Sequence, residues 1–211
     1  MSISSIRKDY QLRSLCESDV HASPVLQFSQ WWDEALASEI DEVNAMTLST
    51  ITAAGRPSAR IVLLKGFDEK GFVFYTNYES NKGQQLNAYP YASLVFFWKE
   101  LERQVRVEGR CERVSSAESD EYFYSRPLGS KLGAWASPQS KIIEGREILD
   151  KNAAALLEQY ASGEVPRPLH WGGYRVVADT VEFWQGRSNR LHDRIKYSHL
   201  DGAWTIERLA P

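Results

Sequence analysis

The chain has 211 residues, of which 43% are hydrophobic and 25% charged, and its formal net charge at pH 7 is -3. These values are typical of a globular protein with one sizeable core, and they favour one domain over two. Because the chain carries no general positive charge, we expect no nucleic-acid or membrane partner, and any anion-binding site requires a local cluster of cations.

The first 22 residues are polar and irregular, and we expect residues 1–22 to form a mobile N-terminal arm. This arm has no long apolar run, so we expect no signal peptide, no transmembrane helix and a cytoplasmic protein. Cys16 and Cys111 are too few and too far apart to predict a disulfide framework or a metal site.

The first predicted helix follows this arm. Ser23 suits the N-cap, and Pro24 suits the first helical position. Apolar residues then recur at helical spacing as far as Ile40, namely Phe28, Trp31, Trp32, Ala35 and Leu36.

From Ala45 onward, the helical period gives way to short runs rich in β-branched and aromatic residues, which are typical of strands. The runs predict five strands, over residues 46–51, 59–65, 72–76, 92–98 and 104–114. Turn signals occur at 54–57, 68–71 and 99–102. Because short connections join antiparallel neighbours, this series predicts a meander or a closed barrel.

The second half of the chain mixes helices and strands. Helical patterns occupy residues 117–125 and 142–160, and a short helical stretch follows Ser80. Three late strands are predicted near 174–178, 181–184 and 204–208. The fold class is therefore mainly β with α (α+β), an antiparallel barrel with flanking helices, and we expect residues 23–211 to form its single domain.

Two cations bracket the second predicted strand. Arg60 and Lys65 enclose an apolar run, and five residues of strand separate them by roughly 16 Å. The odd spacing sends them to opposite faces, which favours two separate anionic groups over one shared phosphate. The alternative is that both are solvated charges at strand ends.

Two further groups suit phosphate. A helix that begins after Ser80 offers free N–H groups to an anion, and Lys82 adds charge. Tyr122 and Arg126 are four residues apart and share a helical face, with Ser130 in the loop after Pro127. An arginine, a phenol and a hydroxyl suit a phosphate monoester. Alternatively, Arg126 stabilises a helix C-terminus through the helix dipole.

Residues 182–194 are the most informative stretch. In an extended backbone, Arg190, His192 and Arg194 would point to one side, close to the aromatic residues Phe183 and Trp184. Fixed cations, an imidazole and an aromatic wall suit a flat anionic ligand. The alternative is a solvated charged strand that follows a core aromatic pair.

The same stretch reads Glu-Phe-Trp-Gln, four residues, then Arg-Leu-His-Asp-Arg, and it resembles the C-terminal signature of the pyridoxamine 5′-phosphate oxidase family. A weaker match lies at residues 7–10. Further blocks resemble the family in the same order, at residues 60–65, 74–77, 101–105, 124–127, 133–135, 171–173 and 208–211.

The resemblance implies an antiparallel split β-barrel that binds flavin mononucleotide (FMN) across a homodimer interface. Asn81 departs from the family, because most relatives carry Arg there, so the flavin phosphate would have one cation fewer. Because Gln139 and Ser140 lie far along the chain from Arg60, we expect them to reach the cofactor from the partner chain. The implied cofactor-binding residues are Arg60, Ile61, Val62, Leu63, Leu64, Lys65, Tyr75, Thr76, Asn81, Lys82, Gln104, Gln139, Ser140, Trp184 and Arg194.

The resemblance also implies the reaction, in which O2 oxidises pyridoxamine 5′-phosphate or pyridoxine 5′-phosphate to pyridoxal 5′-phosphate. Arg190 and His192 would flank the reacting carbon, and Arg7 and Tyr10 would close over the substrate as a lid. The implied substrate-binding residues are Arg7, Lys8, Asp9, Tyr10, Lys65, Tyr122, Arg126, Ser130, Arg190, Leu191 and His192. Two alternatives remain: another split-barrel flavin reductase, and a non-catalytic protein that binds FMN or pyridoxal phosphate.

Overall fold

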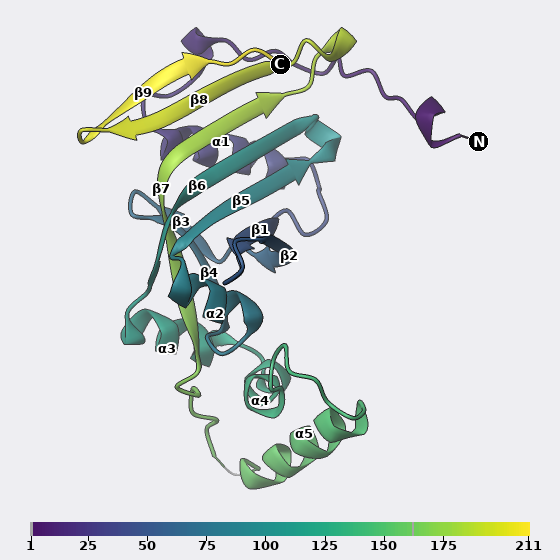
Figure 1. The fold of residues 1–211 in the computed structure, drawn as a ribbon, viewed down its shortest axis with the longest axis vertical. Coiled ribbons are helices and arrows are strands. Elements are labelled where there is room, and N and C mark those ends of the chain that lie inside the picture. Colours follow the sequence, from purple (N-terminus) through teal and green to yellow (C-terminus); the bar gives the residue numbers. More distant parts are fainter. Residues whose placement is uncertain (1, 162) are drawn as a thin grey trace.

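An antiparallel sheet dominates the computed structural model, which describes residues 2–161 and 163–211 (Figure 1). The strands pair in the order β2-β1-β5-β6-β7-β4-β3, and β8 and β9 extend the sheet from β7. The strands are β1 Ala45–Ile51, β2 Pro57–Leu63, β3 Gly66–Asp68, β4 Gly71–Asn77, β5 Tyr91–Trp98, β6 Arg103–Arg113, β7 Trp171–Gln185, β8 Asp193–Leu200 and β9 Ala203–Arg208.

Strand β7 connects two parts of the barrel. One of its edges pairs with β6, while the other pairs first with β4 and then with β8. The sequence predicted two strands here, at 174–178 and 181–184, but the structure has one. Between the two predicted strands, the pairing with β6 shifts register, since Glu108 pairs with Thr180 and Gly109 with Ala178. This irregularity lets β7 continue through residues 179 and 180 without a break. On the far side, the Lys65 amide donates to Val73 O at 2.8 Å and joins the end of β2 to β4.

The helices of the described residues are α1 Pro24–Ala37, α2 Asn81–Ala88, α3 Ser116–Ser125, α4 Leu128–Ala136 and α5 Glu147–Gln159. Ser23 caps α1 as predicted, since its side chain accepts from the Leu26 amide. Helix α4 was not predicted, and the expectation that Ser130 lies in a loop is wrong. Figure 1 shows α3, α4 and α5 at one end of β7, with β8 and β9 at the other.

Aromatic side chains fill the core between α1 and the sheet. Phe28 contacts Phe72 and Phe96, with ring centroids 4.9 and 5.2 Å apart, and Trp31 meets Phe183 edge-on at 5.1 Å. A smaller cluster under the helices contains Phe123, Leu132, Val165 and Trp171. Over the described residues, the structure contains no helix with the length and apolar character needed to cross a membrane.

The N-terminal arm is attached to the barrel over its second half. Leu15 is buried in the main core, whereas residues 2–9 are exposed. Arg208 of β9 ties the arm to β8, because its guanidinium contacts Glu17 Oε1, Asp193 Oδ1 and Leu15 O at 2.8, 2.8 and 2.9 Å. The second half of the arm therefore lies beside β8 and β9, near the C-terminal end of the chain (Figure 1).

Candidate functional site

A cavity of about 350 Å³ lies where the end of β2 meets β4, α3 and the segment after α4. We call it the basic cavity, because Arg60, Lys65, Lys82 and Arg126 line it. It brings together most of the cofactor and phosphate residues predicted for the first half of the chain. Its lining consists of Arg60, Ile61, Val62, Leu63, Lys65, Tyr75, Thr76, Lys82, Tyr122, Arg126, Gln139 and Trp171.

Arg60 and Lys82 are two neighbouring cations held by neutral groups. The Arg60 guanidinium donates to Thr50 Oγ1 at 2.6 Å and to Ser58 Oγ at 2.7 Å. Lys82 Nζ donates to Gln139 Oε1 at 3.0 Å, and burial together with the nearby Arg60 charge lowers the pKa of Lys82. Within residues 2–161 and 163–211, no carboxylate forms an ion pair with either cation. Their uncompensated charge favours an anionic ligand.

Arg126 provides a second cationic position in the same cavity. Its guanidinium lies 4.6 Å from the centroid of the Trp171 ring, and burial lowers its pKa. Its Nη1 is buried and has no hydrogen-bond partner among the described residues. Tyr75, Tyr122 and Trp171 stack nearly parallel beside it, with centroids 4.1 to 6.1 Å apart. An unsatisfied guanidinium beside flat aromatic walls suits a planar ligand that carries an anionic group.

The structure corrects two expectations about this cavity. Arg60 and Lys65 do not alternate along one strand, because β2 ends at Leu63, and both line the same cavity. Gln139 contacts Thr76 and Lys82 of its own chain, so its distance from Arg60 along the sequence does not require the partner chain. Asn81, Ser130 and Ser140 are exposed, Leu64 is buried, and none of these four is among the lining residues.

A second cavity, of about 500 Å³, lies at the other end of the sheet, and we call it the arm cavity. The arm residues Arg7, Lys8, Asp9 and Tyr10 meet Arg190 and His192 there, as the resemblance implied, whereas Leu191 is exposed. The lining consists of Ile6, Arg7, Lys8, Asp9, Tyr10, Arg187, Asn189, Arg190 and His192.

The extended backbone predicted for residues 190–194 is wrong. Ser188–Arg190 form a tight turn in which Asn189 and Arg190 have left-handed φ values of 56° and 61°, and β8 begins only at Asp193. Arg194 does not line the arm cavity. Its Nε donates to Glu182 Oε1 at 2.8 Å, and its Nη1 donates to Ala210 O at 2.8 Å. The turn and this carboxylate separate Arg194 from Arg190 and His192.

His192 is held as a neutral ring. The Arg187 amide donates to its Nδ1 at 3.0 Å, so Nδ1 is unprotonated and the neutral ring carries its proton on Nε2. Desolvation, with a smaller effect of the Arg190 charge, lowers the pKa of His192. The ring lies 4.6 Å from Trp184 and 6.0 Å from Tyr10 between centroids.

We expect His192 to titrate below the ordinary pKa of histidine, and Arg190→Ala to raise this pKa because it removes one of its causes. Neutral His192 therefore stabilises the folded state fully when the pH is above the pKa of histidine in the unfolded chain. This stability is lost as the pH falls through the lower pKa of His192 in the folded state, because the protonated ring cannot accept the hydrogen bond from the Arg187 amide. NMR titration measures the imidazole pKa in the wild type and in Arg190→Ala, and the signal lost in His192→Ala assigns His192 among the four histidines. An equal or lower pKa in Arg190→Ala would contradict this assignment of cause.

The remaining predicted cofactor residues form a row on the outer face of the sheet. Gln104 of β6 pairs with Trp184 of β7, and Trp184 pairs with Arg194 of β8. Trp184 also contacts His192, so this row adjoins the arm cavity. Trp171, in the basic cavity, lies 13 residues away on the same strand, about 40 Å at the rise of a β-strand. The predicted residues therefore form two clusters at opposite ends of β7.

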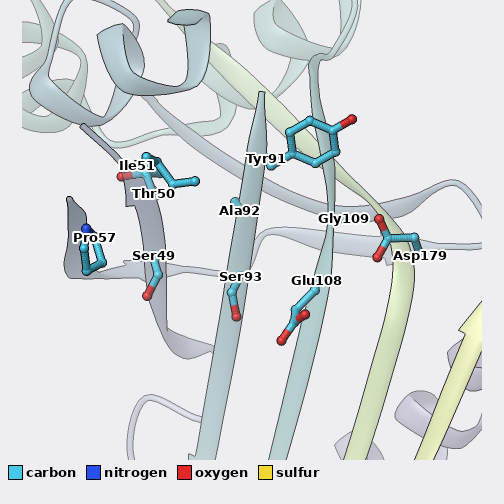
Figure 2. A pocket seen from close by; sticks show the side chains of 10 residues that line it. All are labelled: Ser49, Thr50, Ile51, Pro57, Tyr91, Ala92, Ser93, Glu108, Gly109 and Asp179. Carbon is cyan, nitrogen blue, oxygen red and sulfur yellow. The ribbon is translucent and has the colours of Figure 1, made fainter. Parts of the chain in front are cut away.

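Another hollow, of about 320 Å³, lies across β1, β5 and β6 (Figure 2). Ser49, Ser93 and Glu108 occupy neighbouring strands there, and Asp179 closes one side. The lining contains two carboxylates and no cation, so this hollow does not suit an anionic ligand.

The sequence did not predict several residues that hold the site residues in place. Trp171 belonged to a family-like block but had no assigned role, although it lies beneath Arg126. Glu182 holds Arg194, and Glu102 holds the arm through Gln11 and Leu12. Glu182 and Glu102 are distant in sequence from the residues that they bind. The sequence feature that could have indicated them is an acidic residue at a position where the strand pattern predicts burial.

Comparison with known proteins identifies two family models that match successive segments of the chain. The model of a family described as pyridoxamine 5′-phosphate oxidase matches residues 32–160. A second, described as the pyridoxine 5′-phosphate oxidase C-terminal dimerisation region, matches residues 171–211. The chain is 56% identical to the pyridoxine/pyridoxamine 5′-phosphate oxidase of Acaryochloris marina, covering 100% of this chain and 96% of the relative. It is also 56% identical to the enzyme of that name from Burkholderia multivorans, covering 100% and 99%.

Solved structures share the fold. PhzG from Burkholderia lata 383, in complex with tetrahydrophenazine-1-carboxylic acid, is similar with a TM-score of 0.87 and 30% identity, covering 92% of this chain and 95% of that one. A pyridoxamine 5′-phosphate oxidase-related, FMN-binding protein from Nostoc punctiforme has a TM-score of 0.72 at 18% identity, covering 91% and 100%. The fold is thus an antiparallel split barrel, as the family resemblance implied.

Proposed function

Because the chain belongs to the pyridoxamine 5′-phosphate oxidase family, we propose that it oxidises pyridoxamine 5′-phosphate and pyridoxine 5′-phosphate to pyridoxal 5′-phosphate. It is an FMN-dependent oxidoreductase of vitamin B6 biosynthesis and salvage, and it forms a homodimer. The observation that carries the proposal is the basic cavity, in which two cationic positions have no carboxylate partner among the described residues.

The residues of the basic cavity fit FMN. Arg60 and Lys82 supply adjacent, partly desolvated charges for its phosphate, beside the first turn of α2. Gln139 already contacts Lys82 and can donate to the cofactor through its amide. When bound, FMN accepts the electrons from the 4′ carbon of the substrate.

The substrate phosphate suits the second cationic position. Arg126 offers its unsatisfied Nη1, and Lys65 and Tyr122 line the same wall. At the other cluster, His192 presents an N–H at Nε2 to the ligand, because its Nδ1 is occupied by the Arg187 amide. Arg190 adds a fixed cation on the same cavity wall. These two residues orient the reacting end of the substrate while Lys65 and Arg126 hold its phosphate.

The separation of the clusters supports a site shared between subunits. A substrate whose phosphate contacts Arg126 cannot reach His192 of the same chain, since these clusters lie about 40 Å apart along β7. In our proposal, a two-fold axis places the outer row of Gln104, Trp184 and Arg194 against the basic cavity of the partner, with FMN between them. The dimerisation region at 171–211 contains most of this row.

O2 is the proposed electron acceptor. With the amine substrate, oxidation by O2 and hydrolysis by water give pyridoxal 5′-phosphate, H2O2 and NH3, whereas the alcohol gives pyridoxal 5′-phosphate and H2O2. A cytoplasmic location remains part of this proposal. The absence of nucleic-acid and membrane partners is also part of it, on the basis of the net charge of -3.

One assay tests the function. The purified protein is mixed with FMN and pyridoxamine 5′-phosphate in air, and aldehyde and peroxide are measured together. We expect both to form in equal amounts without a nicotinamide cofactor. A flavin reductase would require the nicotinamide and form no aldehyde, and a binding protein would form neither product. Either outcome would refute the proposed oxidase.

A further inference from the structure

Glu102 is a buried carboxylate at the turn between β5 and β6. Its side chain is 3% exposed, and its backbone has a left-handed φ of 54°. Within the described part of the chain, the carboxylate binds no side chain of the barrel. Its Oε2 accepts from the amides of Gln11 and Leu12 at 2.9 and 3.1 Å, and Lys8 Nζ lies 3.2 Å from Oε1. Each of these groups belongs to the N-terminal arm.

The same residue also holds the loop that carries Arg190 and His192. The Glu102 carbonyl accepts from the Gly186 amide at 2.7 Å and from Gln185 Nε2 at 3.2 Å. Glu102 therefore joins the arm to the end of β7 through its side chain and its backbone. A shift of this turn would move both walls of the arm cavity.

These contacts place Tyr10 against the site. Its ring covers Gly186 so closely that an added Cβ there would lie 2.7 Å from Tyr10 Cγ. The ring meets Trp184 edge-on at 5.8 Å and lies 6.0 Å from His192. Tyr10 is thus fixed between the predicted cofactor row and the predicted substrate residues.

A second anchor lies further along the arm. The Leu15 amide donates to Asp193 Oδ2 at 3.1 Å, and the Leu15 carbonyl accepts from Arg208 at 2.9 Å. Leu15 is also buried in the core. If the Glu102 contacts break, the chain before Arg13 keeps the Ser188 Oγ–Tyr10 O contact at 3.4 Å and the ring contacts of Tyr10. Arg13, whose Nη1 lies 3.1 Å from Glu34 Oε2, and Leu15 hold the rest of the arm in place.

We propose that Glu102 is the positioning residue that docks the arm over the active site, and that substrate exchange opens this contact while the Leu15 anchor holds. This inference rests on the proposed function. Glu102 touches neither predicted ligand, so it acts through Tyr10 and the other arm residues of the cavity. Because Glu102 binds backbone amides, this contact does not depend on which side chains stand at positions 11 and 12.

The first test is Glu102→Gln in the full-length, FMN-loaded enzyme. The amide keeps the size of the side chain but loses its charge and one acceptor, so we expect the KM for pyridoxamine 5′-phosphate to rise about tenfold or more. The kcat and the FMN affinity should change little. Tryptic cleavage after Arg7 and Lys8 should become faster. Glu100→Gln, at an exposed position in the same turn, is the matched control and should behave like the wild type.

The second test removes the donor on the arm and leaves the buried turn intact. Gln11→Pro deletes one of the two amides that bind Glu102, whereas Gln11→Ala keeps both. We expect Gln11→Pro to reproduce the higher KM and the faster cleavage, and Gln11→Ala to reproduce neither. In the double variant Glu102→Gln/Gln11→Pro, the two effects on KM should be less than multiplicative, because both remove one contact.

Three results would overturn this inference: unchanged KM and cleavage in Gln11→Pro, fully multiplicative effects in the double variant, or equal effects of Gln11→Ala and Gln11→Pro. Cleavage and FMN titration need no turnover. A protein that docks its arm through Glu102 but forms no aldehyde would refute the proposed function alone.

Discussion

Replacing Arg126 with alanine should raise the KM for pyridoxamine 5′-phosphate about ten- to a hundredfold, while FMN stays bound. The Arg126 guanidinium is partly buried and its Nη1 lacks a partner within the described chain, so a phosphate that binds there gains a charge-assisted hydrogen bond. Such a bond contributes about 1.5–3 kcal/mol, which gives the expected factor. Steady-state kinetics and an FMN titration of the same preparation measure the two effects separately.

Two further variants make this result specific. Lys65→Ala should also raise KM, because Lys65 lines the same cavity. Lys131→Ala is the matched control, since Lys131 Nζ lies 5.8 Å from the Tyr124 ring in a similar contact but outside the cavity. Loss of FMN from Arg126→Ala with a normal substrate affinity would assign Arg126 to the cofactor instead.

A heterodimer of Arg126→Ala with His192→Ala should regain activity that both parent homodimers lack. In the proposed dimer, each site combines the basic cavity of one chain with the arm cavity of its partner. The mixed dimer then has one site with both defects and one intact site, so we expect about half of the wild-type activity per dimer. Co-expression with two affinity tags isolates the heterodimer, and the assay uses a substrate concentration well below the KM of Arg126→Ala.

The pairing of Arg126→Ala with Lys65→Ala provides the control. Both changes lie in the basic cavity, so every site of that heterodimer has one defect, and its activity should stay at the level of the parents. Recovery in this control, or no recovery with His192→Ala, would mean that the two clusters do not form a shared site.

Local patterns predicted much of the fold. Ser23 and Pro24 marked the start of α1, and the alternating apolar runs located β1, β2, β4, β5 and β6 within a few residues. Helix α4 was missed because Pro127, Gly129 and Gly133 weaken its helical pattern. Strand β8 was not predicted, because the charged residues at 190–194 are typical of a solvated segment. The buried Ile195 and Tyr197 nevertheless alternate with Lys196 and Ser198, as expected for a strand.

The residues of the candidate site were predicted more completely than its geometry. The family-like blocks located the cations of both cavities, but a linear sequence does not show that Arg126 and His192 lie at opposite ends of one strand. The carboxylates Glu102, Glu182 and Asp193 were missed because their partners are 6 to 178 residues away. Such contacts form only in the folded chain, and the spacing of residues within a short segment does not predict them.

The insertion of β7 between β6 and β4 has a consequence for biosynthesis. Until residues 171–185 leave the ribosome, β6 lacks its second neighbour and β4 pairs only with the three-residue β3. A nascent chain that ends near residue 160 therefore exposes two open strand edges, which are sites of aggregation. Completion of the sheet depends on contacts of high sequence separation, so folding should be slow and should finish after translation rather than during it.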